Sequence, residues 1–401
     1  MTPPAPAARR RGRRRGASFL QILALWLLGW WGIVGALLAP VMPGRWAGAL
    51  ALAVVTSLPL GMFLLRGRGK YPGAAFRLLV ARPFWYVQLA LPVVGTAGAV
   101  GALAGLPFGA AGIAGRWALA GAAAFYAAVM AAGYVGSRRM TVTPLVATIP
   151  DLPPALDGLR VVQLSDLHVG PHTPRRQLAR AARAVAAARP DLIAVTGDQV
   201  DDNAPDVAHY AAAFGALQAP LGVYVIPGNH DAYAGWRDVH RRFAAAVPGQ
   251  TMLVNEARVV RHNGAALAVV GVGDPAAAGE GAGPDPDAAL RRVPRGAFVL
   301  ALAHNPVLWP ALAERGVPLT LSGHTHWGQF AIPRLGWSLA TPFLEHAMGA
   351  HRAGRSLLYI HPGTNYWGIP FRLGTPPEIA VITLRRGDEA GIERGRGETA
   401  R

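Results

Sequence analysis

Five short polar clusters carry residue types that bind metal ions. They are Ser165-Asp166-Leu167-His168, Thr196-Gly197-Asp198, Gly228-Asn229-His230-Asp231, Ala303-His304-Asn305 and Ser322-Gly323-His324-Thr325-His326. The clusters offer carboxylate, amide and imidazole ligands, which suit Mn, Fe or Zn rather than a soft metal. The chain has no Cys, so disulfides and thiolate metal sites are excluded.

The order of the clusters is more informative than any one of them. A single Asp-x-His or Gly-Asp pair is weak evidence, because Asp and Gly are common in turns. Here each cluster directly follows an apolar run that predicts a strand. Ligands of α/β proteins bind at the carboxyl ends of strands, where loops distant in sequence converge. The five clusters therefore predict one site.

The cluster order Asp-x-His, Gly-Asp, Gly-Asn-His-Asp, His, Gly-His-x-His resembles the signature of calcineurin-like metallophosphoesterases. The resemblance extends from about residue 152 to residue 384. The tail at 362–374 and 377–379 is similar to the bacterial membrane-associated branch, which often has N-terminal transmembrane helices. The resemblance implies an α/β sandwich of two mixed β-sheets flanked by helices. It also implies a metal-dependent phosphoric ester hydrolase, with phosphodiesterase activity among the candidates.

The resemblance further implies two divalent metal ions, with Mn as the first expectation and Fe or Zn as alternatives. It assigns seven ligands: Asp166, His168 and His326 for one ion, Asn229, His304 and His324 for the other, and Asp198 as the bridge. His230 is implied to be catalytic, facing the phosphate and assisting the leaving group or stabilising charge. Two such ions clamp the phosphoryl oxygens and acidify a bridging water, whose hydroxide attacks phosphorus in line.

Other residues near the clusters have more than one interpretation. Asp201, Asp202 and Asp231 either support neighbouring His rings or are solvated acids of turns. Arg372 and Glu378 match the family tail, and a structural ion pair is their simplest interpretation.

Strands that alternate with helices position the clusters. Apolar runs predict strands at 159–164, 192–196, 222–226, 267–271, 298–303, 319–322, 357–360 and 379–384, and helices at 175–188 and 206–217. Such alternation is typical of α/β layers. We expect a catalytic domain at 158–386, a Pro-rich linker at 138–157 before it and a flexible tail at 387–401.

The N-terminal part predicts an all-α membrane domain. Apolar runs at 18–40, 46–65, 84–106 and 117–136 predict about four transmembrane helices within 18–137, after a basic N-terminus at 1–17. A buried soluble helix is the alternative, and the Ala- and Gly-rich fourth run is closest to it. Lys and Arg concentrate before the first run, between the second and third, and after the fourth. The positive-inside rule then predicts a multi-pass protein of the inner (plasma) membrane with a cytoplasmic catalytic domain.

Charge is distributed unevenly along the chain. The first 140 residues hold 15 of the 39 Lys and Arg residues and none of the 22 Asp and Glu residues. Residues 141–401 therefore carry 24 basic against 22 acidic side chains, although the whole chain has a net charge of +17. This balance gives the soluble part no basic excess, so no nucleic acid partner is expected.

The sequence leads to two hypotheses for function. The first is a membrane-anchored phosphoesterase that hydrolyses phosphate mono- or diesters, with a lipid-linked ester among its candidate substrates and the bilayer as its partner. The alternative is a catalytically weak membrane scaffold or sensor with the same fold, although no predicted ligand is missing. The apolar segment 327–356 starts at the expected site. It is either a lip that meets the membrane or an acyl chain, or packing over a sheet edge.

Overall fold

The structure is a computed structural model that describes residues 25–66, 76–170 and 173–395. The chain divides into two compact units, Met1–Ala131 and Ala132–Arg401. The expected basic N-terminus at 1–17 and the start of the first apolar run, 18–24, lie outside the described residues.

The first unit consists of apolar helices. They are Leu25–Val41, α2 (Trp46–Arg66), η2 (Arg77–Ala81), α4 (Arg82–Gly105), η3 (Leu106–Phe108) and most of α5 (Ala111–Gly136). Helices α4 and α5 approach closely, because a Cβ at Gly101 would collide with Ala118. Small residues at such a contact are typical of helices that pack within a membrane.

The number of membrane spans differs from the prediction. Among the described residues, Leu79–Phe108 and Ala111–Gly136 are long and apolar enough to cross a membrane, and they correspond to the third and fourth predicted runs. The first two runs correspond to Leu25–Val41 and α2 (Trp46–Arg66), and residues 18–24 of the first run lie outside the described residues. The prediction of about four spans is wrong for the described residues, which contain two candidates.

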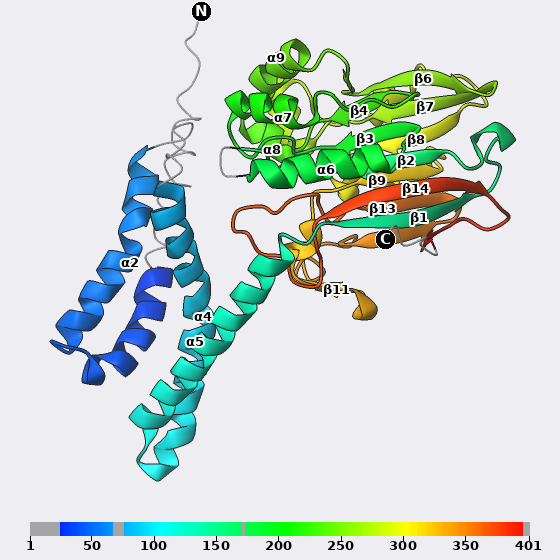
Figure 1. Cartoon of the computed structure of the whole chain (residues 1–401). Coiled ribbons are helices and arrows are strands. Elements are labelled where there is room, and N and C mark those ends of the chain that lie inside the picture. Colours follow the sequence, from blue (N-terminus) through cyan, green and yellow to red (C-terminus); the bar gives the residue numbers. More distant parts are fainter. Residues whose placement is uncertain (1–24, 67–75, 171–172, 396–401) are drawn as a thin grey trace, which may run out of the picture. The chain divides into compact units, whose positions relative to one another are not determined.

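The second unit is built on two large β-sheets that pack face to face (Figure 1). The seven-stranded sheet has the order β15-β1-β14-β2-β3-β4-β5, and the six-stranded sheet has the order β12-β13-β9-β8-β7-β6. Each sheet contains both parallel and antiparallel pairs. The strands of the first sheet are β1 (Thr141–Ile149), β2 (Arg160–Leu164), β3 (Leu192–Thr196), β4 (Val223–Ile226), β5 (Thr251–Met252), β14 (Glu378–Arg386) and β15 (Gly391–Arg394). Those of the second are β6 (Glu256–His262), β7 (Ala265–Gly271), β8 (Phe298–Leu302), β9 (Leu319–Ser322), β12 (Gly349–Ala353) and β13 (Ser356–Ile360).

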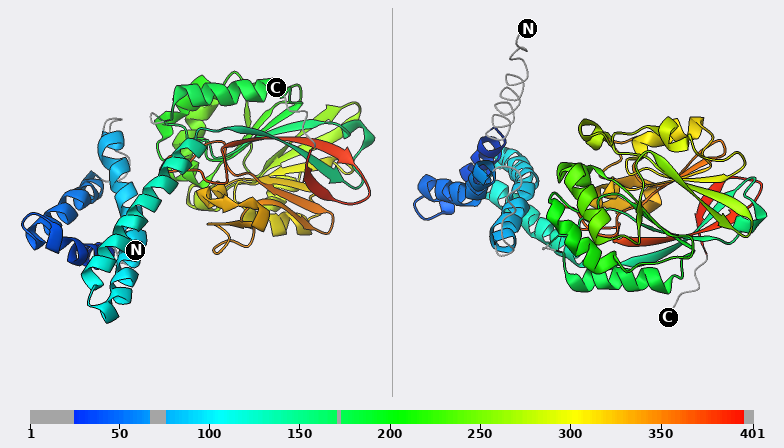
Figure 2. Two further views of the ribbon diagram at one scale, coloured as in Figure 1. Left: turned by 60° about the horizontal axis from the view of Figure 1, so that its bottom comes forward. Right: turned by 90° about the horizontal axis from the view of Figure 1, so that it is seen from above.

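Helices cover the outer face of each sheet (Figure 2). Helices α6 (Arg175–Ala187), α7 (Val207–Phe214) and α9 (Trp236–Ala246) pack on the first sheet, and α10 (Pro286–Leu290) and α11 (Trp309–Glu314) pack on the second. Strand β14 illustrates the layering, because successive side chains of a strand point to opposite faces. Its Ile379 and Val381 face the helices, whereas Ala380 and Ile382 lie in the core between the sheets. The predicted sandwich of two mixed sheets flanked by helices is thus confirmed.

Two segments that were expected to be irregular contain strands. The expected linker at 138–157 holds β1, which pairs in parallel with β14 along its whole length, and η4 (Pro154–Leu156). Pro144 is tolerated because its carbonyl accepts a hydrogen bond from Gly395 beyond the end of β15, so its missing N–H takes nothing from the pairing with β14. The expected flexible tail at 387–401 contains β15, and residues 396–401 lie outside the described residues.

Candidate metal centre

The predicted site residues follow strands that end at one edge of the sandwich. These strands are β2, β3 and β4 of the first sheet and β8 and β9 of the second. Gln163 of β2 links the two sheets by hydrogen bonds near this edge. Its Nε2 donates to Thr196 Oγ1 and to the Ser322 carbonyl, both at 2.9 Å.

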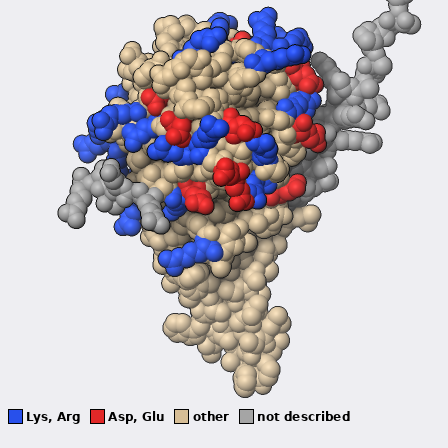
Figure 3. Space-filling model, turned by 90° about the vertical axis from the view of Figure 1, so that its right-hand side faces the viewer, with Lys and Arg blue, Asp and Glu red and all other residues tan. Residues whose placement is uncertain are grey.

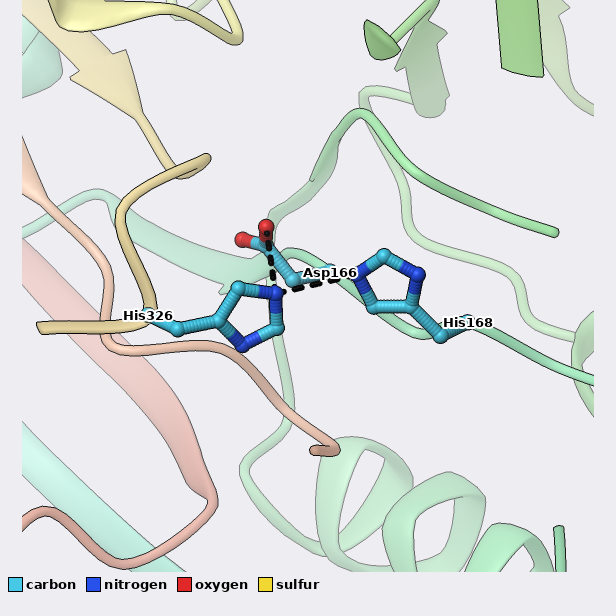
Figure 4. A group of neighbouring side chains, drawn as sticks. All are labelled: Asp166, His168 and His326. Atoms are coloured by element: carbon cyan, nitrogen blue, oxygen red, sulfur yellow. Dashed lines mark hydrogen bonds and ion pairs between the residues drawn. The ribbon is translucent and has the colours of Figure 1, made fainter. Parts of the chain in front are cut away.

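Asp166, His168 and His326 form the first group of candidate ligands (Figure 4). His168 Nε2 lies 2.9 Å from His326 Nε2, which lies 3.3 Å from Asp166 Oδ1. All three side chains are buried. Two ring nitrogens and a carboxylate oxygen thus converge, as the ligands of one metal ion must.

Asn229, His304 and His324 form the second group. Asn229 Oδ1 lies 2.7 Å from His324 Nδ1 and 3.1 Å from His304 Nε2. The other nitrogen of His304, Nδ1, donates to the Thr196 carbonyl at 2.7 Å. This hydrogen bond fixes the tautomer and leaves the Nε2 lone pair free for a ligand role.

Asp198 lies between the two groups. Its Oδ2 is 3.6 Å from His168 Nε2 and 3.3 Å from His304 Nε2. Its Oδ1 accepts a hydrogen bond from the backbone N–H of His230 at 2.8 Å. One carboxylate therefore contacts both ligand groups, and its role as a bridge between two ions, which the family resemblance implies, stays a prediction.

The backbone of these loops is strained. A positive φ is uncommon outside glycine and costs about 1–3 kcal/mol, and such residues cluster at functional sites. The φ angles are 53° at Asp166, 41° at His168, 54° at Asp198, 72° at His324 and 49° at His326. The motif glycines permit close approach as well, because a Cβ at Gly228 would collide with Asp198 Oδ1.

The donor set fits divalent cations. Asp166 and Asp198 are fully buried, and within the described ranges neither pairs with a Lys or Arg side chain. A buried carboxylate needs a compensating charge or a metal ion. Oxygen and imidazole donors without thiolate supply the chemistry that such an ion prefers.

Comparison with known proteins identifies the family. The family model for calcineurin-like phosphoesterases matches residues 159–328. A metallophosphoesterase of Helicobacter pylori strain J99 is 31% identical over 263 residues, which cover 65% of this chain and 69% of that protein. The chain belongs to the calcineurin-like phosphoesterase family.

Two further relatives of this chain are an animal protein and a bacterial protein. A Bos taurus protein named "Transmembrane protein with metallophosphoesterase domain" is 32% identical over 257 residues, or 61% of this chain and 57% of that protein. A Bacillus subtilis protein named metallophosphoesterase YkuE is 29% identical over 240 residues, or 58% of this chain and 82% of that protein. The chain therefore spans less than two thirds of the length of the bovine relative.

Burial and neighbouring charges shift the pKa values of the candidate ligands in both directions. Burial lowers the pKa values of His168 and His304, but the nearby acids outweigh it and raise them. Burial and then the nearby Arg372 hold the pKa of His326 well below its usual value, and burial and then His304 lower the pKa of His324 to about 4. Both rings are therefore neutral near pH 7, as a metal ligand must be. Burial alone would raise the pKa of Asp198, but His304 and His168 outweigh it and lower that pKa, so the carboxylate is ionised.

His230, the predicted catalytic residue, lies beside Asp198 and forms with His168 and Asp198 a further group of side chains that could hold a metal ion. Its Nδ1 donates to the Asp201 carbonyl at 2.5 Å. Burial lowers the pKa of the ring. The aromatic rings of Tyr233 and Trp367 lie edge-on to it, with centroids at 5.3 Å and 5.7 Å, and both side chains are exposed. Beyond its place in the family tail, no sequence pattern predicted Trp367 at this position.

Asp201 and Asp231 have contacts that the sequence left open. Asp201 Oδ1 lies 3.3 Å from His168 Nδ1, so it can orient that ring. Asp231 is buried and accepts from the backbone N–H groups of Val200 at 3.1 Å and Gly228 at 2.9 Å. It thereby connects the loops that follow β3 and β4. Neither residue is a solvated acid of a turn.

Arg372 and Glu378 make no direct ion pair with each other among the described residues. Arg372 is buried and donates to the His326 carbonyl at 3.0 Å and to the Pro362 carbonyl at 2.6 Å, and its Nη2 lies 2.8 Å from His326 Nδ1. Glu378 instead accepts from Thr143 at 2.6 Å and Tyr359 at 2.5 Å. Arg372 is therefore a positioning residue for His326.

Proposed function

We propose that this chain is a membrane-anchored, metal-dependent phosphoesterase that hydrolyses phosphate mono- or diesters at a dinuclear centre. One observation carries the proposal. The Asp198 carboxylate contacts His168 and His304, and so joins two groups of buried oxygen and nitrogen donors. A single-ion site would not need a carboxylate in that position, whereas two ions that share a phosphate do.

The candidate ligands have different roles in the proposed reaction. Divalent ions held by the two groups would supply the positive charge that acidifies a water and offsets the charge of the phosphate. Asp166, His168 and His326 hold one position, Asn229, His304 and His324 hold the other, and Asp198 spans both. The protein contributes a preorganised geometry, because strained loops and buried hydrogen bonds fix these donors before substrate arrives.

His230 is proposed to act on the leaving group. The Asp201 carbonyl fixes its Nδ1–H, so Nε2 is the atom that faces substrate. Its pKa is lowered by burial, but the negative charge of a bound phosphate favours the imidazolium and raises that pKa again. The ring would then carry a proton for the departing oxygen only when phosphate is present.

Membrane anchoring is proposed through the two candidate spans, Leu79–Phe108 and Ala111–Gly136. The name of the bovine relative and the exposed apolar side chains of these helices support it. Arg77 and Arg82 flank the start of the pair, and Arg138 and Arg139 follow its end. These basic residues favour a cytoplasmic catalytic unit at the inner (plasma) membrane. A C-terminal reporter fusion tests the orientation, since a reporter active only outside the cytoplasm contradicts it.

A lipid-linked phosphate ester is the substrate class that anchoring favours. Nucleic acid is not favoured, because Figure 3 shows basic and acidic side chains interspersed on one face of the catalytic unit. Activity on lipid-linked and on water-soluble esters, compared at equal concentration in one membrane preparation, separates the substrate classes.

Activity of the purified full chain tests the proposal. With Mn²⁺ the chain should cleave an aryl phosphate mono- or diester. Asp198→Asn should lower both bound metal and turnover, by more than the roughly 10–100-fold that loss of a supporting residue costs. Asp287→Asn, at an exposed ion pair far along the chain, is the matched control. Inactivity of the parent chain with several divalent metals would instead favour the scaffold.

A further inference from the structure

A hairpin next to the metal centre exposes large apolar side chains. It covers residues 330–344 and contains β10 (Ala331–Ile332), η9 (Pro333–Leu335) and β11 (Trp337–Ser338). Figure 1 shows the segment that carries β11 projecting from the sandwich. Its exposed apolar side chains are Ile332, Leu335, Leu339, Phe343 and Leu344, of which Leu335 and Phe343 are 74% and 84% exposed. Exposed apolar side chains gathered in this way mark an interaction surface.

The base of this hairpin is tied to the end of a candidate membrane helix. Ala331 N donates to the Leu373 carbonyl, and Leu373 N donates to the Gln329 carbonyl, both at 3.0 Å. The neighbouring Arg372 N donates at 2.9 Å to the carbonyl of Gly133, in the last turn of α5. That last turn belongs to the same compact unit as the hairpin. If α5 crosses a membrane, its last turn and the hairpin base lie near the membrane surface.

The charge of the hairpin fits a lipid surface. Between Trp327 and Leu344 the only charged residue is Arg334, which is exposed, and the acidic Glu345 directly follows the hairpin. Two further basic residues, Arg138 and Arg139, directly follow α5. Apolar side chains with basic neighbours and an aromatic residue such as Trp337 are the composition of elements that lie in an anionic membrane interface. Packing over a sheet edge would instead bury the apolar tips, which are exposed.

We propose that the hairpin 330–344 inserts its apolar tip into the lipid interface beside the metal centre. The inference rests on the proposed membrane anchoring and adds a second point of contact. An interfacial element enters the boundary of headgroups and acyl chains by about 5–10 Å. Because the hairpin begins four residues after the predicted ligand His326, its insertion would hold the catalytic edge against the membrane. A phosphate ester whose lipid part stays in the bilayer then lies within reach.

The absence of Cys makes a direct test possible, since one introduced thiol is the only labelling site. The full chain is reconstituted into nanodiscs of phosphatidylcholine and phosphatidylglycerol. Leu335→Cys and Phe343→Cys are labelled with an environment-sensitive NBD fluorophore, and Val259→Cys, exposed on strand β6 of the second sheet, is the matched control. Lipids brominated near the headgroup should quench most of the emission at the two hairpin sites. Lipids brominated near the chain end should quench less, and the control should keep its emission.

Three results would overturn the inference. In the first, brominated lipids quench the emission at the hairpin sites no more than at the control site. In the second, they quench the emission at all sites alike. In the third, the hairpin sites are protected from both brominated lipid and aqueous iodide, which would mean that the hairpin packs against protein. The readout needs no hydrolysis. A chain that cleaves no ester but shows hairpin quenching therefore refutes the proposed function alone, and an active chain with an unquenched hairpin refutes the inference alone.

Discussion

Replacing Arg372 by Met should destabilise the catalytic unit strongly, because this buried side chain positions His326 by hydrogen bonds. The guanidinium donates to the carbonyls of His326, Pro362 and Asn365 and lies beside His326 Nδ1. Met fills similar space but donates nothing. Each buried acceptor left without a partner costs about 1–3 kcal/mol. For three carbonyls near the lower end of that range, we expect a loss of about 3–5 kcal/mol.

The loss converts to a measurable shift in melting temperature. For a domain of about this size, 1 kcal/mol corresponds to about 2–4 °C, so Arg372→Met should lower Tm by about 6–20 °C. Tryptophan fluorescence of the purified full chain during heating reports the transition, and mass spectrometry reports bound metal. Arg372→Lys keeps the charge but lacks the planar fork, so its Tm should fall between those of the parent and Arg372→Met.

Arg355→Met is the matched control. Arg355 pairs with Asp151 at an exposed position, where an ion pair contributes about 0–1 kcal/mol. Its Tm should move by no more than a few degrees, with metal content unchanged. If Arg372→Met and Arg355→Met melt at the same temperature and bind the same amount of metal, Arg372 does not position His326.

Two other substitutions test the packing and the electrostatics around the site. Gly228→Ala should lower metal content and activity together at a cost of about 1–3 kcal/mol, because its Cβ would collide with the Asp198 carboxylate. Gly249→Ala, where a Cβ meets open space, should change neither quantity in metal analysis and activity assays. Burial and then Arg372 lower the pKa of His361 to about 3. Between pH 6.5 and pH 3 the folded chain therefore binds fewer protons than the unfolded chain. The free energy of unfolding then falls as the pH falls. The substitution His361→Asn keeps a hydrogen-bond acceptor in the side chain. It should reduce the pH dependence of the free energy of unfolding, measured with urea, by up to about 1.4 kcal/mol per pH unit. An unchanged slope would contradict the lowered pKa of His361.

The buried strands could be predicted from the sequence because their surroundings are uniform. Strand β3 occupies the predicted residues 192–196, and all five of its side chains are buried. A strand covered on both faces is a continuous apolar run, and a polar cluster marks its end. The candidate ligands lie directly after such runs, so both their place in the fold and their order could be derived. Their assignment to particular ions stays a prediction.

The missed features depend on contacts that leave no local pattern. Strand β1 contains Pro144, which argues against a central strand unless the position of β15 is known. Strand β6 carries charged residues and is largely exposed at a sheet edge, so it lacks an apolar run. The contact of Arg372 with His326 joins residues 46 apart in the chain.

One segment connects the end of helix α5 to the candidate ligands. Within 362–374, Thr364 N donates to the Ser165 carbonyl and Asn365 Nδ2 donates to the Leu167 carbonyl, both at 2.8 Å. These two acceptors lie on either side of Asp166, in the loop that follows β2. Farther along, the backbone of Arg372 binds the last turn of α5 while its side chain binds His326. The same short segment therefore sets the position of the helix end and of ligand loops from both sheets. This role explains a family tail that has no metal ligands of its own. The segment holds both ligand loops, so that their donor atoms converge.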